Sequence, residues 1–234
     1  MEKRHPTSDL VFDPLPSHSI AIRPLYKYLP ELHARSLVDK GEVLVTTLEK
    51  CRQAEMGRER TDPDEGTRLT IAPRQTFSWE GKGSADPFFD RFIGGTGKGI
   101  RFIDSTFRLR EVSEDLFIYC TTSRFDRALM EEFGCDACVR IDNSWEFLRA
   151  VTDALGARVQ RPWRWGPCVY RTREQHFQKR DIDRVDPAFL KDESYNRQRE
   201  VRAVWTPSSQ PIKPVILTAP VVVRYCTLHW PRSE

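Results

Sequence analysis

The sequence has no hydrophobic run long enough to cross a membrane. Its most apolar stretch, residues 215–223, is interrupted by Pro220 and is half as long as the about 18 apolar residues that a spanning helix needs. The first residues, Met1 to Pro6, are not followed by the hydrophobic segment of an export signal. We therefore expect a cytoplasmic protein without a membrane partner.

A strong net charge is also absent. The 234 residues include 37 Lys and Arg against 34 Asp and Glu, which leaves a formal charge of +3. Coiled-coil heptads are missing, and 13 Phe, 6 Trp and 6 Tyr are too many for a fully disordered chain. No internal repeat or linker divides the sequence. We expect an N-terminal arm at residues 1–22 and a single domain at residues 23–234.

The cysteines are too few and too scattered for a disulfide scaffold. Only Cys135 and Cys138 have the spacing of metal ligands, and no second pair of this kind exists. A zinc site would need distant His or Cys residues, and the alternative is two ordinary cysteines beside a buried strand. We assign no metal site.

The glycine-rich run at residues 94–99 does not match a phosphate-binding P-loop. That pattern requires glycine at position 92 and Ser or Thr at position 99, where the sequence has Phe92 and Gly99. A hairpin turn or a loop is the better interpretation of this run.

The hydrophobic pattern predicts short strands, which dominate the second half of the chain. We expect strands at 24–28, 43–47, 69–71, 100–103, 106–109, 116–120, 137–141, 168–170, 201–205 and 221–226, and helices at 31–40, 126–133, 144–155 and, briefly, 187–190. Crossover helices are too few for a doubly wound parallel sheet. The predicted class is α+β with mostly antiparallel pairing, and strands 25–28, 116–120 and 201–205 should be neighbours.

Two of these helices have recognisable ends. Ser123 or Asp126 is placed to cap the helix at 126–133, and Asn143 or Ser144 the helix at 144–155. The helix at 31–40 should end at a glycine, Gly41.

The first of three segments suited to ligand binding is Leu25-Tyr26-Lys27-Tyr28. Strand alternation puts Lys27 on one face and the two tyrosines on the other. Lys27 is either an exposed residue of an edge strand or a cation directed at a phosphate or a carboxylate.

The second segment is Thr121-Thr122-Ser123, directly after the predicted buried strand. Hydroxyl groups at the end of a strand can hydrogen-bond the ribose of a ligand. Ser123 can instead cap the following helix, and the two roles are compatible.

The third segment is residues 195–202, Tyr-Asn-Arg-Gln-Arg-Glu-Val-Arg. In an extended chain, Gln198 and Glu200 lie on the same face. A glutamate that enters an apolar strand is costly to bury unless it is paired. The alternative to a catalytic role is therefore a salt bridge from Glu200 to Arg197, Arg202 or Lys191.

In their order along the chain, these segments resemble the signature of the ADP-ribosyltransferase superfamily. That signature has a basic residue in an early aromatic strand, a strand with Ser or Thr residues, and a Gln/Glu-x-Glu whose last glutamate is catalytic. Lys27, residues 121–123 and Gln198-x-Glu200 match it, with Lys27 in place of Arg or His. The resemblance covers residues 24–226 and implies two small packed, mostly antiparallel sheets with flanking helices.

The resemblance also implies NAD as the substrate and a role for each residue. Glu200 would stabilise the oxocarbenium-like state that forms as nicotinamide leaves ribose C1′. Gln198 would contact the acceptor or orient Glu200. Lys27, with Tyr26 beside it, would meet the pyrophosphate as a point charge. The hydroxyls of Thr121, Thr122 and Ser123 would hold the nicotinamide-side ribose.

The chain is also similar to a bacterial family whose activity is not established. The shared motifs are Leu25-Tyr26-Lys27-Tyr28, Thr61-Asp62-Pro63-Asp64-Glu65 with Thr in place of the usual Asn, and the segment from Tyr195 to Arg202. This similarity supports the fold assignment more than the chemistry.

A fourth segment, residues 158–173, is rich in arginine and aromatics and has no acidic residue. Its candidate acceptor-binding residues are Arg158, Arg161, Trp163, Arg164, Trp165 and Arg171. Arginine interleaved with aromatics suits phosphate contact and base stacking. The alternative is a surface loop in which arginines stack on tryptophans. A nucleic-acid acceptor would explain the segment, and a protein acceptor stays open as the alternative.

The favoured function is NAD-dependent ADP-ribosyl transfer or NAD hydrolysis, by a bacterial toxin or defence effector that an antitoxin would restrain. It requires Lys27, Ser123 and Glu200 to converge on one cleft. One alternative is a non-catalytic nucleic-acid-binding module that uses residues 158–173.

A second alternative is a metal-dependent nuclease or other hydrolase. It would use the acidic turn Asp62, Asp64 and Glu65, and it requires these carboxylates near a lysine. Pro63 and Gly66 are typical of a turn, so a solvated loop is the simpler interpretation of this segment.

Overall fold

The computed structural model describes residues 24–53, 62, 64–79, 99–172, 174–176 and 185–230. The expected arm at 1–22 lies outside the described residues, as does the glycine-rich run except for Gly99.

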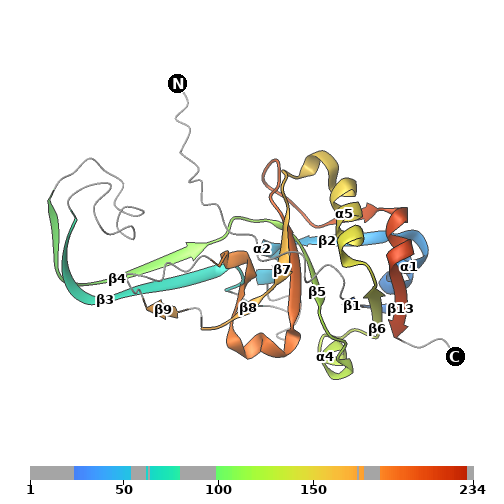
Figure 1. The fold of residues 1–234 in the computed structure, drawn as a ribbon, viewed down its shortest axis with the longest axis horizontal. Coiled ribbons are helices and arrows are strands. Elements are labelled where there is room, and N and C mark those ends of the chain that lie inside the picture. Colours follow the sequence, from blue (N-terminus) through green and yellow to red (C-terminus); the bar gives the residue numbers. More distant parts are fainter. Residues whose placement is uncertain are drawn as a thin grey trace.

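One branched, antiparallel sheet organises the described part of the chain (Figure 1). Its strands are β1 (Leu25–Leu29), β2 (Glu42–Thr47), β5 (Phe117–Thr122), β6 (Ala137–Ile141), β7 (Arg164–Pro167), β11 (Glu200–Trp205), β12 (Val215–Thr218) and β13 (Cys226–Trp230). The main order is β12-β2-β5-β1-β6-β13, while β11 pairs with β5 and β7 pairs with β11. The predicted α+β class and its mostly antiparallel pairing are confirmed.

Strand β5 is the branch point of this sheet. One edge pairs with β11 along its full length, from Thr122 opposite Glu200 to Phe117 opposite Trp205. The other edge is shared, because β2 pairs only with residues 117–118 and β1 pairs with Thr122. Strands β1 and β2 therefore separate over the middle of β5. The predicted neighbours, strands 25–28, 116–120 and 201–205, are confirmed, whereas the implied pair of separate sheets is one sheet joined through β5.

The remaining strands form two smaller units. The long strands β3 (Thr67–Trp79) and β4 (Ile100–Val112) make an antiparallel hairpin, along which β9 (Glu174–His176) runs parallel to β3. This hairpin extends away from the main sheet (Figure 1). Strands β8 (Val169–Tyr170) and β10 (Leu190–Lys191) pair in parallel beside β11. The two strands predicted between residues 100 and 109 are one continuous strand.

The helices follow the sequence signals closely. They are α1 (Glu31–Lys40), α2 (Leu48–Arg52), α4 (Arg127–Glu132), α5 (Ser144–Leu155), and the 3-10 helices η2 (Gly156–Arg158), η3 (Pro187–Phe189), η4 (Glu193–Gln198) and η5 (Pro220–Tyr225). Asn143 caps α5 by accepting from the Glu146 amide, and Asp126 caps α4 by accepting from the Leu129 amide. Both caps are among those predicted from the sequence.

The main core lies between the sheet and the helices α1, α5 and η5. The apolar face of α5 buries Phe147, Leu148, Val151 and Leu155 against Trp205 of β11, among others. These four positions recur at the spacing of one helical face, which is why the sequence predicted them.

The predicted strand at 221–226 is wrong. Residues 220–225 form the 3-10 helix η5, and β13 begins only at Cys226. Pro220 favours the first position of a helix because its φ is fixed and it has no amide proton. Val222 is fully buried in the core, so packing overrides the strand preference of the three valines.

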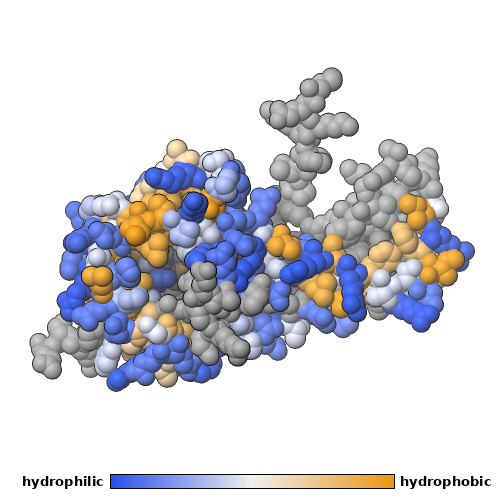
Figure 2. All heavy atoms as spheres, turned by 180° about the vertical axis from the view of Figure 1, so that it is seen from behind, coloured by the Kyte–Doolittle hydropathy of each residue, from blue (hydrophilic) through white to orange (hydrophobic). Residues whose placement is uncertain are grey.

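The surface agrees with the composition. Figure 2 shows a largely hydrophilic face, on which apolar side chains gather in separate groups. In the part of the chain that the structure describes, no helix is long and apolar enough to cross a membrane.

Two glycines provide a test of how the end of α1 is fixed. Gly41 and Gly134 both have left-handed backbone, at φ 70° and 62°. A Cβ on Gly41 would lie 2.4 Å from the Ala219 carbonyl oxygen, whereas a Cβ on Gly134 would meet nothing within 4 Å. We expect Gly134→Ala to lower the free energy of unfolding by about 1–2 kcal/mol, the cost of the left-handed conformation. Gly41→Ala should cost clearly more, and equal urea midpoints for the two variants would contradict the assigned contact.

Candidate functional site

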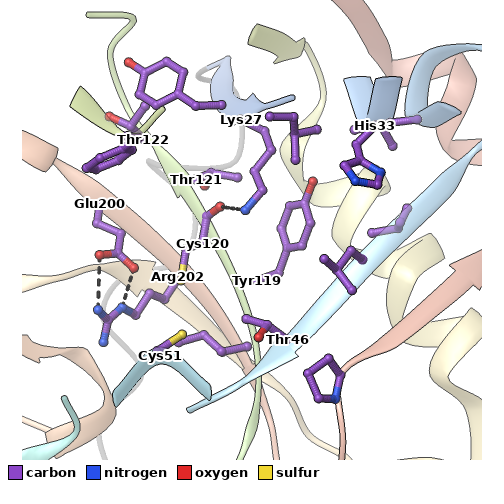
Figure 3. A pocket seen from close by; sticks show the side chains of 18 of the residues that line it. Lys27, His33, Thr46, Cys51, Tyr119, Cys120, Thr121, Thr122, Glu200 and Arg202 are labelled. Carbon is purple, nitrogen blue, oxygen red and sulfur yellow. Dashed lines mark hydrogen bonds and ion pairs between the residues drawn. The ribbon is translucent and has the colours of Figure 1, made fainter. Parts of the chain in front are cut away.

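A pocket of about 490 Å³ opens where β1 and β2 separate over β5. Strands β1, β2, β5 and β11 and the helix α1 contribute to its walls. Figure 3 shows Lys27, Thr121, Thr122 and Glu200 around this cavity. Its volume is within the usual range for small-molecule sites.

Lys27 is half-buried in the gap between β1 and β2. Its Nζ donates a hydrogen bond of 2.7 Å to the Cys120 carbonyl of β5 and lies 4.7 Å from the centre of the Tyr119 ring. The lysine thus satisfies a backbone carbonyl at the branch of the sheet. An ammonium group has three donors, so this contact leaves capacity for an anionic ligand.

The hydroxyl residues at the end of β5 are mostly tied to neighbouring backbone. Thr121 Oγ1 donates to the Val201 carbonyl at 3.0 Å, and Thr122 Oγ1 donates to the Arg124 carbonyl at 3.1 Å. Both threonines line the pocket, while Ser123, which bonds the Arg199 carbonyl, is not among its lining residues. Of the expected triplet, the first two positions are at the site.

Glu200 is almost fully buried, with 7% of its surface exposed, and two cations hold it. Arg202 Nε donates to Oε1 at 2.6 Å, Arg202 Nη2 donates to Oε2 at 3.1 Å, and Lys191 Nζ donates to Oε2 at 2.6 Å. Glu200 therefore forms the salt bridges to Arg202 and Lys191 that the sequence analysis gave as the alternative to a catalytic role. Arg197, the third candidate partner, pairs with Glu132 instead.

The backbone explains why Glu200 and Arg202 share one face. Helix η4 ends at Gln198, Arg199 has left-handed backbone at φ 42°, and β11 begins at Glu200. From there, strand alternation turns Glu200 and Arg202 toward the network, while Val201 packs in the main core. Gln198 joins from η4 by accepting from Lys191 Nζ at 2.5 Å.

Glu65, which the sequence analysis named as a functional residue only for the hydrolase alternative, is a further member of this network. Its carboxylate contacts Arg202 Nη1 at 2.8 Å and Lys191 Nζ at 3.8 Å. Asp62 and Glu65 are only 4% and 2% exposed, so the interpretation of the acidic turn as a solvated loop is wrong for these two residues. Glu65 forms long-range salt bridges to β10 and β11, and no local pattern in the sequence predicts them.

The acidic turn does not act as one carboxylate cluster. Glu65 faces Lys191, as a nuclease would require, but Asp64 is exposed and pairs with Arg110 of the hairpin. Among the described residues, no group of three or more His, Cys, Asp or Glu side chains is placed to hold a metal ion. Cys135 and Cys138 are both buried in a cluster with Tyr28.

The charges of the network control its titration. Burial by itself raises the pKa of Glu200, but the charges of Arg202 and Lys191 outweigh it and hold that pKa well below its usual range. Burial lowers the pKa of Lys191, but attraction to Glu200 outweighs it, so that pKa stays above its usual value. The site therefore keeps an ionised carboxylate at any pH near neutrality.

The arginine-rich segment lies outside the pocket. Arg161 pairs with Asp153 at 2.7 Å, and Arg164 pairs with Asp186. Trp163 stacks between two other tryptophans, with its ring centre 5.4 Å from that of Trp145 and 6.1 Å from that of Trp205. The described pocket lining includes none of the six candidate acceptor-binding residues, Arg158, Arg161, Trp163, Arg164, Trp165 and Arg171. Arg161 and Arg164 thus pair with carboxylates, whereas the sequence alternative was a surface loop in which arginines stack on tryptophans.

Comparison of the chain with models of known families, with curated proteins and with solved structures finds no match. The interpretation of the site therefore rests on its own geometry.

The buried network predicts a pH-dependent stability. Since folding lowers the pKa of Glu200, its contribution is present above the unfolded-state pKa of about 4.3 and is lost as the pH falls below it. At pH 7, Glu200→Gln should cost about 3–5 kcal/mol, because Lys191 and Arg202 lose a buried counter-charge. The difference from wild type should shrink as the pH falls toward 3.

The matched control is Glu131→Gln. Glu131 forms an exposed pair with Arg127, and such pairs contribute under about 1 kcal/mol. Urea unfolding at several pH values measures both variants. A constant cost of Glu200→Gln between pH 7 and pH 3 would show that its charge is not the stabilising feature.

Proposed function

We propose that the protein binds NAD in this pocket and cleaves the bond between nicotinamide and ribose, passing ADP-ribose to water or to an acceptor. The observation that carries this proposal is the meeting of three distant segments. Six of the residues assigned from the sequence line one pocket: Tyr26, Lys27, Thr121, Thr122, Gln198 and Glu200.

The branched sheet gives further support. A site between diverging strands presents side chains from several strands to one ligand, and here β1 supplies a cation, β5 supplies hydroxyls and β11 supplies a carboxylate. Along the chain, the cation, the hydroxyls and the carboxylate follow one another in the order of the ADP-ribosyltransferase signature. In the proposal, Lys27 meets the pyrophosphate, and Thr121 and Thr122 accept hydrogen bonds from ribose hydroxyls.

Glu200 would act on the ribose. As the glycosidic bond breaks, positive charge develops on C1′ and the ring oxygen, and a fixed anion nearby lowers the energy of that state. The lowered pKa of Glu200 keeps it ionised. Its oxygens accept three hydrogen bonds from Lys191 and Arg202, and a carboxylate has about four acceptor positions. A hydrogen bond from the Cys120 side chain also lowers the pKa of Glu200, so a ribose hydroxyl would have to displace this weaker donor.

The same contacts favour a second candidate, which is NAD binding without cleavage. Glu65 and Glu200 carry two negative charges, and Lys191 and Arg202 carry two positive ones. The net charge of the network is zero, which weakens its attraction for a developing cation. Binding through Lys27 and the threonines does not need a net negative charge.

We propose water as the acceptor in preference to nucleic acid. A nucleic-acid acceptor was expected from residues 158–173, but Arg161 and Arg164 already have carboxylate partners. Nucleic acid would have to displace Asp153 and Asp186 to use them. A role as a bacterial toxin or defence effector restrained by an antitoxin fits NAD consumption in the cytoplasm, and it is proposed on that ground alone.

Incubation of the purified protein with NAD tests both candidates. Release of free nicotinamide, followed by chromatography with and without added nucleic acid, supports cleavage, and faster release with nucleic acid would identify an acceptor. NAD binding by calorimetry without release supports the second candidate. If NAD is neither bound nor cleaved, both candidates are refuted.

Substitution of Lys27 tests whether NAD binds in this pocket or elsewhere on the protein. Lys27→Met should weaken NAD binding roughly 10- to 100-fold, because a charge-assisted hydrogen bond is worth about 1.5–3 kcal/mol. Lys40→Met is the matched control, since Lys40 is exposed at the end of α1 and is not among the described residues that line the pocket. Calorimetry measures both. Equal affinities for the two variants would place the ligand elsewhere.

Substitution of Glu200 tests its chemical role. Glu200→Gln should retain NAD binding and lower nicotinamide release by about 10²–10³-fold, the effect of removing one preorganised electrostatic contact. Because this variant is also expected to be less stable, release is measured well below its melting temperature. Wild-type release from the folded variant would end the catalytic assignment.

A further inference from the structure

Two thiols lie together at the wall of the pocket and have no part in the proposed chemistry. Cys51 comes from α2 and Cys120 from β5, and both line the cavity. Both pack against the apolar cluster that contains Leu48, Leu116 and Ile118, and a hydrogen bond between the two side chains is the largest influence on the pKa of each. Figure 3 shows both beside Arg202. Residues far apart in sequence thus form a dithiol that is reachable from a cavity.

The surroundings of Cys51 differ from those of Cys120, Cys138 and Cys226. The hydrogen bond to Cys51, together with burial, raises the pKa of Cys120 well above its usual value. The hydrogen bond from Cys120 lowers the pKa of Cys51, burial opposes this, and the charge of Arg202 adds to the lowering. By contrast, burial raises the pKa of Cys138 and Cys226 to about 12. A thiolate is the reactive form of cysteine, so Cys51 is the expected nucleophile.

The Cys120 thiol also links the pair to the carboxylate of the site. Its side chain is in hydrogen-bond contact with Glu200 as well as with Cys51. A change in the oxidation state of Cys120 would therefore remove a donor from the network that holds Glu200.

We propose that Cys51 and Cys120 form a reversible, peroxide-sensitive disulfide in the wall of the pocket. The Cys51 thiolate attacks one oxygen of hydrogen peroxide, the O–O bond breaks, and the departing hydroxide takes a proton to become water, which leaves a sulfenic acid on Cys51. The Cys120 sulfur then attacks the Cys51 sulfur. The S–S bond forms, the S–O bond breaks, and a second water leaves with the Cys120 proton. Two thiols and one peroxide give one disulfide and two waters.

Peptide mapping of the full-length reduced protein tests this. The protein is treated with increasing hydrogen peroxide, denatured, alkylated and digested for mass spectrometry. We expect the loss of alkylation at Cys51 and Cys120 together, a linked peptide lighter by two hydrogens than its two thiol peptides combined, and full reversal by dithiothreitol. Cys226, which is also half-buried but has a raised pKa, should stay alkylated over the same range.

Three variants make the test specific. Cys120→Ser should leave a sulfenic acid on Cys51 that dimedone traps, with no linked peptide. Cys51→Ser should abolish the link and leave Cys120 unoxidised, while Cys226→Ser should behave as wild type. Oxidation of Cys226 at the same peroxide concentration as Cys51, or irreversible oxidation of Cys51 without a link, would overturn the proposal. Because this readout needs no NAD, its failure is distinct from failure of the proposed function.

Discussion

The ion-pair network around Glu200 is the interaction on which the site depends. It joins the turn before β3, the strand β10 and the start of β11 through Glu65, Lys191, Glu200 and Arg202, all of them buried. Arg202 also donates to the Ala188 carbonyl of η3 at 2.6 Å. Buried charges are tolerated only when each has a partner of opposite charge in good geometry. This requirement fixes the positions of the three segments relative to one another.

The branching of the sheet at β5 is the second constraint, and it creates the space that the network borders. If β1 and β2 did not separate along β5, no pocket could lie between them. Instead each takes one end of the strand, and Lys27 satisfies the Cys120 carbonyl in the gap. The lysine is thus both part of the fold and a cation in the pocket. A ligand phosphate would share its remaining donors.

Local signals were sufficient for much of the fold. The helix at 31–40 was predicted with its observed bounds because its apolar face and Gly41 mark them, and α5 was found from its cap at Asn143 and its four buried positions. The strand 137–141 was also placed correctly. The helix η5 was not found, because its three valines have strand propensity, and only the burial of Val222 and the start imposed by Pro220 reverse it.

The sequence by itself determined the α+β class, most elements and a set of residues, including Lys27, the threonines of β5 and Glu200, that line one pocket. These follow from periodicity, caps and residue chemistry, which act over a few positions along the chain. Only the tertiary structure decided that Glu65 is buried against Arg202, that Arg161 and Arg164 have carboxylate partners, and that Cys51 meets Cys120. The partners of Glu65 and Cys51 lie more than 60 positions away, and electrostatic pairing in a folded core leaves no periodic trace in the order of residues.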